Sequence, residues 1–160
     1  MDLQNYKFFQ RLVIQLSGFK NAKIYIIMDR VSVIKNLADE IYDLLGPGCL
    51  ESHYHDAFKM GFQLEGIQYE SERILPVLFR GFATGQYLRM DLVVEKTLIL
   101  ELKSVKKITE ESKQQLSRYM RVSGLGRGML VNFGMGCVEV MYATMDGGRV
   151  TFSQDFSCPG

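Results

Sequence analysis

The sequence predicts an α/β (α+β) fold, in which a mixed central β-sheet is flanked by helices. Three segments before residue 65 have apolar residues at roughly helical steps of three and four, which is the spacing of an amphipathic helix. Later in the chain, β-branched and apolar runs alternate with turn residues and therefore predict strands. One further helical segment lies between these runs, an order that is typical of a sheet covered by helices.

Four helices are expected. Apolar residues recur at helical intervals in residues 3–16, 31–45 and 50–64, and glycine-containing breakers follow each of these segments. Thr109 can cap a fourth helix, because its hydroxyl can accept a hydrogen bond from the first turn. This helix is expected to run to about Val122, before Ser123-Gly124.

The expected strands are short and bounded by turn residues; they cover residues 23–28, 67–81, 86–95, 97–105, 128–133 and 138–145. The link at Glu95-Lys96 is so short that the strands on either side of it should form a hairpin. We therefore expect an N-terminal extension (1–27, a helix plus a short strand), a main domain (28–146) and a C-terminal tail (147–160) with at most one edge strand.

Composition and charge limit the kind of protein. A chain of 160 residues has room for one domain. Nineteen Lys and Arg against 18 Asp and Glu exclude a protein that wraps nucleic acid through bulk charge, although a local basic patch is compatible with them. No uninterrupted apolar run reaches the ~18 residues of a membrane helix. Cys49, Cys137 and Cys158 are too few and too scattered for a disulfide framework or a zinc site, and an odd number of thiols, interpreted as free, favours a soluble intracellular protein.

Three charged residues interrupt two predicted strands. Glu101 and Lys103 lie two positions apart, so they project from the same face of their strand. Asp91 interrupts the preceding strand, and the predicted hairpin would bring it close to Glu101. Two carboxylates in a poorly solvated place repel each other, so either Lys103 neutralises one of them or a divalent cation binds both. The alternative interpretation is a solvated strand face on which Glu101 and Lys103 pair weakly.

Further motifs lie on either side of these charges. Gly48-x-x-Glu51-x-x-Tyr54 stands between two predicted helices, and Gln115 and Tyr119 lie four residues apart in the helix after the charged strand. Together with Asp91 and Glu101-Leu102-Lys103, in this order, the motifs resemble the GxxExxY family, a branch of the PD-(D/E)XK nuclease superfamily. The resemblance covers roughly residues 30–141. It implies a restriction-endonuclease-like fold for the main domain.

The resemblance also implies metal-dependent hydrolysis of phosphodiester bonds. The ligands of Mg²⁺ or Mn²⁺ would be Glu51, Asp91, Glu101 and the backbone carbonyl of Leu102. Lys103 would orient the attacking water or contact the scissile phosphate. Such a site combines oxygen ligands with a positive charge, which suits a hard cation that polarises a phosphoryl oxygen.

The remaining motif residues have two interpretations each. Gln115 and Tyr119 would contact a phosphate or the Lys103 end of the site; without the resemblance, Tyr119 would simply be a core aromatic whose hydroxyl reaches Gln115. Tyr54 would support the carboxylate of Glu51 or only pack in the core. Basic residues after the charged strand would bind the nucleic-acid backbone or be the charges of a solvated helix: Lys106, Lys107, Lys113, Arg118, Arg121 and Arg127.

His53 and His55 form an H-x-H pattern that could suggest zinc. Residues two apart on a helix point about 200° away from each other, so the two rings cannot readily bind one ion. We therefore expect solvated or packed histidines at both positions.

The expected function is a small Mg²⁺- or Mn²⁺-dependent nuclease that acts on nucleic acid, with DNA favoured. The alternative is a catalytically silent nucleic-acid-binding or protein-interaction module on the same fold, because a fold does not fix an activity. The net charge of only +1 favours a protein partner that delivers the substrate, or a narrow substrate such as an end, a flap or a modified duplex. A homodimer is a further partner to consider.

Overall fold

The structure of the protein is a computed structural model that describes residues 22–155, with side chains from Arg30 to Gln154. The helix expected at residues 3–16 and the end of the expected tail lie outside this range. The chain divides into two compact units after Leu37, and the sheet belongs to the second unit, which begins at Ala38. The sites described below lie within the second unit.

The first described helix, α2, runs from Ala22 to Leu45. The short strand expected at residues 23–28 is therefore wrong. The β-branched and aromatic residues of segment 23–28 favoured a strand, but no breaker separates this segment from the helical pattern that begins at Val31. Because adding residues to an existing helix is easier than starting a new element, one continuous helix forms. Gly46, with a φ of 67°, ends it.

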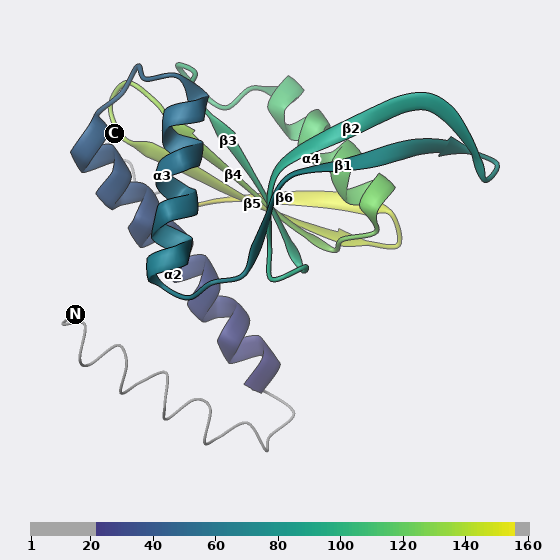
Figure 1. The fold of residues 1–160 in the computed structure, drawn as a ribbon, viewed down its shortest axis with the longest axis horizontal. Helices are drawn as coiled ribbons and strands as arrows, with labels where there is room; N and C mark the ends of the chain where they lie inside the picture. Colours follow the sequence, from purple (N-terminus) through teal and green to yellow (C-terminus); the bar gives the residue numbers. More distant parts are fainter. Residues whose placement is uncertain (1–21, 156–160) are drawn as a thin grey trace. The chain divides into compact units, whose positions relative to one another are not determined.

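Six strands form one mixed sheet, arranged in chain order (Figure 1). They are β1 (Tyr69–Phe79), β2 (Phe82–Val94), β3 (Leu98–Lys103), β4 (Arg127–Phe133), β5 (Val138–Asp146) and β6 (Arg149–Asp155). Neighbouring strands are antiparallel except β3 and β4, which are parallel and are connected through α4 (Glu110–Ser123). The arrangement confirms the expected α/β (α+β) fold, a mixed central sheet flanked by helices.

The predicted hairpin between β2 and β3 is confirmed. Its turn consists of Glu95 and Lys96, which have φ values of 48° and 58°. Two left-handed residues in a row match the right-handed twist of paired strands, and this turn usually contains Asn or Gly. The backbone N–H of Thr97 donates to the carbonyl oxygen of Val94 at 3.0 Å and closes it. The turn therefore fixes the register that places β3 beside β2.

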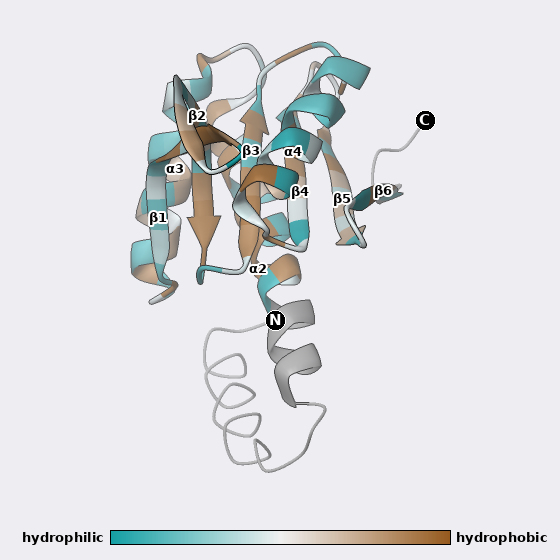
Figure 2. Cartoon of the chain, turned by 90° about the vertical axis from the view of Figure 1, so that its right-hand side faces the viewer, coloured by the Kyte–Doolittle hydropathy of each residue, from teal (hydrophilic) through white to brown (hydrophobic). Residues whose placement is uncertain are grey.

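Two helices cover the sheet from opposite sides, α3 (Glu51–Leu64) on one and α4 on the other (Figures 1 and 2). On the α4 side, Leu116 and Met120 join Ile99 and Leu130 in a fully buried cluster. The close approach depends on Gly128, because a Cβ atom there would lie 2.8 Å from Cδ1 of Leu116. Figure 2 shows hydrophobic residues along β3 and along the end of β2 in this part of the sheet. The strands that carry Asp91 and Glu101 are thus held from both faces.

The fourth expected helix has the predicted cap. The backbone N–H of Ser112 donates to the hydroxyl of Thr109 at 3.2 Å, and Gly124 follows the helix with a φ of 73°. The segment expected as a tail contains β6, which pairs with β5 through the turn at Gly147 and Gly148.

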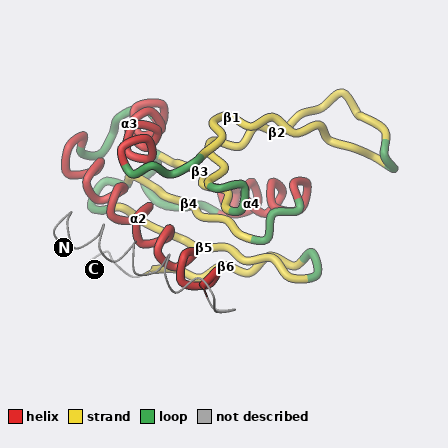
Figure 3. The backbone as a smooth tube through the Cα atoms, turned by 60° about the horizontal axis from the view of Figure 1, so that its bottom comes forward, coloured by secondary structure: helices red, strands yellow, loops and turns green. Residues whose placement is uncertain are grey.

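β1 and β2 are longer than the other strands and continue beyond the sheet as a paired arm (Figure 3). No helix within residues 22–155 is long and apolar enough to cross a membrane. Cys49 is a free thiol, whereas Cys137 is disulfide-bonded, so the expectation that the thiols are free is wrong for Cys137.

Candidate active site

The site begins where β2 and β3 separate. Their ladder ends at the pair Leu92 and Leu100, while β3 stays paired with β4 as far as Lys103. Beyond that point, two side chains take over the hydrogen bonds of the missing ladder. The backbone N–H of Leu102 donates to Oδ2 of Asp91 at 2.9 Å, and the backbone N–H of Asp91 donates to Oε1 of Glu101 at 3.2 Å. These bonds bring the two carboxylates together, as the predicted hairpin requires.

Glu101 is completely buried. Burial, and next the negative charge of Asp91, raise the pKa of Glu101 from its ordinary value of 4.5 to about 8. The ammonium group of Lys103 opposes this rise, because its Nζ atom lies 3.5 Å from Oε2 of Glu101. Lys103 is itself only 12% exposed, so the alternative of a solvated strand face does not apply. The pair is a buried acid and a nearly buried amine.

Glu51 approaches the same end of β3 from the start of α3. Its Oε1 atom accepts a hydrogen bond from the backbone N–H of Ser104 at 3.4 Å, one residue beyond Lys103. The hydroxyl of Ser104 donates to the carbonyl oxygen of Cys49 at 2.7 Å and ties the preceding loop to the strand. Glu51 is exposed, so it stands at the rim of the site, whereas Glu101 is in its interior.

Tyr54 explains the spacing of the motif that contains Glu51. Its ring is buried and stacks on Phe133, with 3.9 Å between the ring centroids. Its hydroxyl donates to the carbonyl oxygen of Gly46 at 2.7 Å and accepts from the backbone N–H of Cys49 at 3.1 Å. Tyr54 therefore fixes the loop before α3 and, with it, the helix end from which Glu51 projects. Gly48, with a φ of 86°, allows that loop to turn.

His55 is a site residue that the sequence-based reasoning missed. Its Nε2 atom lies 3.2 Å from the carbonyl oxygen of Asp91 and 3.2 Å from Oγ of Ser71. A carbonyl oxygen can only accept, so the bond to Asp91 requires a proton on Nε2. His53, in contrast, is exposed. His55 therefore supports the backbone of Asp91.

A second missed residue is Asn132, which is fully buried at the end of β4. Its side chain accepts from the backbone N–H of Val105 at 2.9 Å and donates to the carbonyl oxygen of Val105 at 3.0 Å. It also donates to Oε2 of Glu139 at 2.7 Å, and that same oxygen accepts from the backbone N–H of Ile108. This network holds the loop that leaves β3 directly after Lys103. A buried polar residue in an otherwise apolar strand was the available signal.

Gln115 and Tyr119 lie together on α4, where Nε2 of Gln115 donates to the hydroxyl of Tyr119 at 2.9 Å. Tyr119 packs in the same core cluster as Ile99, so it lies on the sheet face toward which Glu101 projects. In the described part of the chain, no hydrogen bond joins either residue to Asp91, Glu101 or Lys103. Both residues line a pocket of about 510 Å³ with Glu111, Gln114 and Arg118.

The basic residues expected to receive a nucleic-acid backbone are mostly exposed. Lys106 and Lys107 lie in the loop after β3, and Arg118 and Arg121 lie on α4. Lys113 pairs with Glu110 in the same helix, and Nε of Arg121 donates to the carbonyl oxygen of Gly148 at 3.3 Å. These positions are compatible with binding of a nucleic-acid backbone and equally with ordinary charges on a solvated helix.

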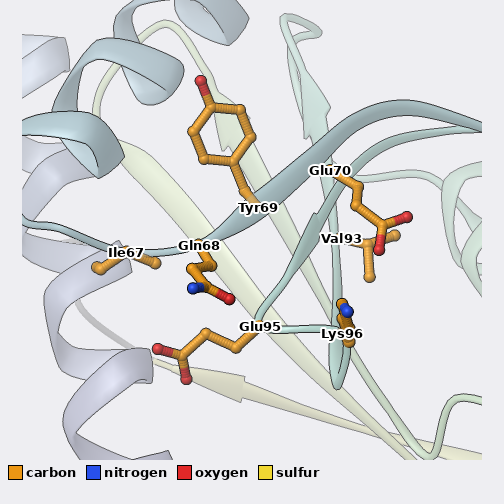
Figure 4. A pocket seen from close by; sticks show the side chains of 7 residues that line it. All are labelled: Ile67, Gln68, Tyr69, Glu70, Val93, Glu95 and Lys96. Carbon is orange, nitrogen blue, oxygen red and sulfur yellow. The ribbon is translucent and has the colours of Figure 1, made fainter.

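A second pocket, of about 360 Å³, lies where β1 and the end of β2 meet the turn to β3 (Figure 4). Figure 4 shows Glu70 and Lys96 on the same side of the strands as Val93, and Gln68 beside Glu95. None of the candidate site residues lines this pocket. Its two carboxylates are on different sides of the strands, so the pocket does not reproduce the arrangement at Asp91 and Glu101.

The donors at Asp91 and Glu101 fit a hard divalent cation. Within residues 22–155, no group of three or more His, Cys, Asp or Glu side chains is arranged to hold a metal ion. Mg²⁺, however, commonly uses one or two carboxylates and completes its shell with water and phosphate. Of the two carboxylate oxygens of Asp91, only Oδ2 accepts a hydrogen bond from the described residues, so the other is available. A cation there would also offset the repulsion that raises the pKa of Glu101.

Comparison with known proteins agrees with this geometry. The family model described as the PD-(D/E)XK nuclease superfamily matches residues 28–143. No curated protein and no solved structure matches the chain. The matched segment contains Glu51, Asp91, Glu101 and Lys103 and the strands that bring the last three together. The chain belongs to the PD-(D/E)XK nuclease superfamily.

Proposed function

We propose that the protein is a divalent-metal-dependent nuclease that hydrolyses phosphodiester bonds in nucleic acid, with DNA as the favoured substrate. One observation carries the proposal: Glu101 is completely buried between a second acid, Asp91, and the amine of Lys103. Burying like charges together is costly, and a structural role alone gives no reason to keep them. A site that binds a dication and a phosphate gives a reason to keep these charged groups together. We also assign the chain to the GxxExxY branch, because Gly48, Glu51 and Tyr54 have the spacing of that motif.

Asp91 and Glu101 would hold Mg²⁺ or Mn²⁺, with the backbone carbonyl of Leu102 as a further ligand. The bound ion would supply a polarised phosphoryl oxygen and a more acidic water molecule. Glu101 must lose its proton before it can act as a ligand, because burial keeps its pKa near 8. Glu51, which stands at the rim and accepts from the backbone N–H of Ser104, would supply a third carboxylate ligand from across the site.

Lys103 has two tasks in this proposal. Without substrate, its ammonium group lies 3.5 Å from Oε2 of Glu101 and opposes the rise that burial causes in the pKa of that acid. With substrate, the same group would contact the scissile phosphate and stabilise the charge that develops there. Its limited exposure, 12%, strengthens that interaction, because little water competes for the ammonium group.

Three other residues act by positioning. His55 holds the carbonyl group of Asp91, Tyr54 holds the loop that leads to Glu51, and Asn132 holds the loop after Lys103. Hydrogen bonds of this kind orient the ligands of a metal site, and their loss typically weakens binding or activity by about 10- to 100-fold.

The test is cleavage of supercoiled, linear and single-stranded DNA and of RNA, each with Mg²⁺, Mn²⁺ or a chelator. Wild type is compared with Asp91→Asn and Lys103→Ala, and Asp146→Asn serves as the matched control, because Asp146 is an exposed acid at the end of β5. We expect cutting by wild type and by the control only with metal, and a loss of about 100-fold or more in the other two variants.

Metal-independent binding with no cutting by wild type on any substrate would instead identify a catalytically silent nucleic-acid-binding module. Cutting that survives in Asp91→Asn and in Lys103→Ala would place the active site elsewhere. A homodimer or a substrate-delivering partner would appear as activity that depends on protein concentration or on an added cell fraction.

A further inference from the structure

The arm formed by β1 and β2 differs in charge from the rest of the protein. The β1–β2 arm is defined here as residues 73–89, the outer part of the β1–β2 hairpin, whose far end projects beyond the sheet (Figures 1 and 3). It contains Arg73, Arg80 and Arg89 and no acidic residue, although the whole chain has a net charge of only +1. The arm is therefore a local basic segment in a nearly neutral protein.

The tip of the arm carries two exposed aromatic side chains. Phe79 and Phe82 are directly opposite each other in the ladder, and they are 67% and 79% exposed. The guanidinium group of Arg80 lies 5.5 Å from the centroid of the Phe79 ring. Exposing two phenylalanines costs solvation free energy, so this arrangement indicates a surface that is covered during function.

The backbone presents this tip in one defined geometry. Arg80 and Gly81, with φ values of 51° and 84°, form the two-residue turn between the aromatic residues. The hydroxyl of Thr84 donates to the carbonyl oxygen of Val77 at 2.9 Å and accepts from the backbone N–H of Gln86 at 3.3 Å. These bonds fix the irregularity in the ladder just behind the tip.

Nearer the sheet, one face of the arm is packed and the other is open. Leu75 and Leu88 pair with each other and pack against the core cluster under α4. On the opposite face, Ile74 pairs with Arg89. Tyr87 lies two residues before Arg89 in β2 and therefore projects from the same face. Ile74 and Tyr87 are 62% and 66% exposed. The open face thus carries the basic group of Arg89 between two exposed apolar or aromatic side chains.

The charges favour nucleic acid over protein as the occupant. Arg73 and Arg89 pair with Glu70 and Glu72, at 3.6 Å and 3.2 Å, but these pairs are partly or largely exposed and contribute little stability. Both arginines can therefore exchange their partners for phosphate groups. Aromatic rings among basic residues are the combination that binds single strands, because bases stack on the rings while cations bind the backbone.

We propose that the β1–β2 arm binds nucleic acid that has unpaired bases, such as a single strand, a flap or a frayed end. Phe79 and Phe82 stack on bases, and the three arginines bind the backbone. The inference rests on the proposed nuclease function and specifies its substrate. Phe82 begins the strand that carries Asp91, on the order of 30 Å away at about 3.3 Å per residue. A strand held at the tip therefore runs along the arm toward the candidate active site.

Binding is measured by fluorescence anisotropy in a chelator, which prevents cutting. The probes are a labelled DNA oligonucleotide as a single strand, as a blunt duplex and as a duplex with one splayed end. The variants are Phe79→Ser/Phe82→Ser and Arg80→Gln. Leu64→Ser is the matched control, because Leu64 is an equally exposed apolar residue, 80% accessible, on α3. Circular dichroism checks the fold of each variant.

We expect the double variant to raise the Kd for the single strand and for the splayed end by about tenfold or more, with a smaller change for the blunt duplex. Arg80→Gln should reduce the slope of log Kd against log salt concentration by about one. Leu64→Ser should bind as wild type does. Unchanged Kd values in both arm variants would overturn the proposal. The proposal would also be overturned if wild type were a dimer and the double variant a monomer that binds DNA equally well, because the arm would then be a self-association surface.

Cutting assays on the same proteins separate this proposal from the nuclease proposal. Wild type that binds through the arm but never cuts with Mg²⁺ or Mn²⁺ supports the arm and contradicts the nuclease. If wild type cuts DNA and the arm variants bind DNA as tightly as wild type, the result supports the nuclease proposal and contradicts the proposal for the arm.

Discussion

The backbone N–H of Asp91 donates to Oε1 of Glu101 at 3.2 Å, so each acid of this pair is held by the other strand. The reciprocal bond, from Leu102 to Oδ2 of Asp91, is 2.9 Å long. The two bonds replace a section of the ladder between β2 and β3 and force two carboxylates into a poorly solvated gap. This arrangement has consequences for stability, for metal binding and for catalysis.

The buried Glu101 should make the metal-free protein less stable as the pH rises. Its folded-state pKa, about 8, is above its ordinary value of 4.5. Between these pH values the native state keeps a proton that the unfolded chain has released, so the free energy of unfolding falls with rising pH. Glu101→Gln removes this effect. We subtract the Tm of wild type from that of Glu101→Gln, both measured in a chelator. This difference should increase by at least about 5 °C between about pH 5 and pH 8.5.

Glu111→Gln is the matched control for this measurement, because Glu111 is an exposed acid on α4. Its Tm should differ from that of wild type by the same small amount at every pH. If the Tm difference between Glu101→Gln and wild type is also independent of pH, Glu101 does not carry the raised pKa that its burial implies.

Metal affinity should increase with pH. A ligand that holds a proton must release it when the ion binds, so the ion competes with that proton. Below the Glu101 pKa of about 8, the apparent affinity for Mn²⁺ should rise about tenfold per pH unit, and above it the affinity should level off. Titration calorimetry in buffers of different ionisation enthalpy also counts the released protons. Affinity that is constant from neutral to alkaline pH would show that Glu101 is not a ligand.

Tyr54→Phe should weaken both the fold and the site. The substitution keeps the ring that stacks on Phe133 but removes the hydroxyl that bonds Gly46 and Cys49. Leaving these partly buried backbone groups unpaired should cost about 1–3 kcal/mol, measured by urea unfolding. Tyr87→Phe is the control, because the Tyr87 side chain is 66% exposed. Equal unfolding free energies in the two variants would mean that the hydroxyl of Tyr54 does not hold the loop.

His55→Ala should lower metal affinity without removing a ligand. The substitution frees the carbonyl group of Asp91 and the hydroxyl of Ser71, so the acid is less well oriented. We expect a loss of about 10- to 100-fold in Mn²⁺ affinity and an activity that partly recovers at high metal concentration. His53→Ala, which changes an exposed ring on the same helix, should behave as wild type does. An identical result for both variants would remove His55 from the site.

The sequence predicted the parts of the site that depend on local rules. The two-residue link at Glu95-Lys96 predicts the hairpin, and the hairpin brings Asp91 to Glu101. The spacing of Glu101 and Lys103 on one strand predicts their ion pair. Periodicity and breakers likewise predict the three described helices, although α2 also includes the segment that was interpreted as a strand.

The roles of other residues depend on contacts between distant parts of the chain. His55 bonds the carbonyl oxygen of Asp91, 36 residues away, and Asn132 bonds the backbone of Val105 across 27 residues. The polar Asn132 in an apolar strand is visible in the sequence, but the backbone groups that Asn132 and His55 bond leave no mark there, so their partners could not be predicted from one chain. The turn at Gly147 and Gly148 is different, because two glycines between short apolar runs are a local hairpin signal, and the expectation of a tail with at most one edge strand underused it.

The central claim is that Asp91 and Glu101 form a dication site, and Asp91→Asn tests it most directly. Asparagine keeps the shape of the side chain and an oxygen that can accept from Leu102, and it relieves the repulsion between the acids. Calorimetric titration with Mn²⁺ should therefore show binding to wild type and none to the variant, whose metal-free Tm should equal or exceed that of wild type. A variant that binds Mn²⁺ as tightly as wild type, or that unfolds at a much lower temperature without metal, would contradict the claim.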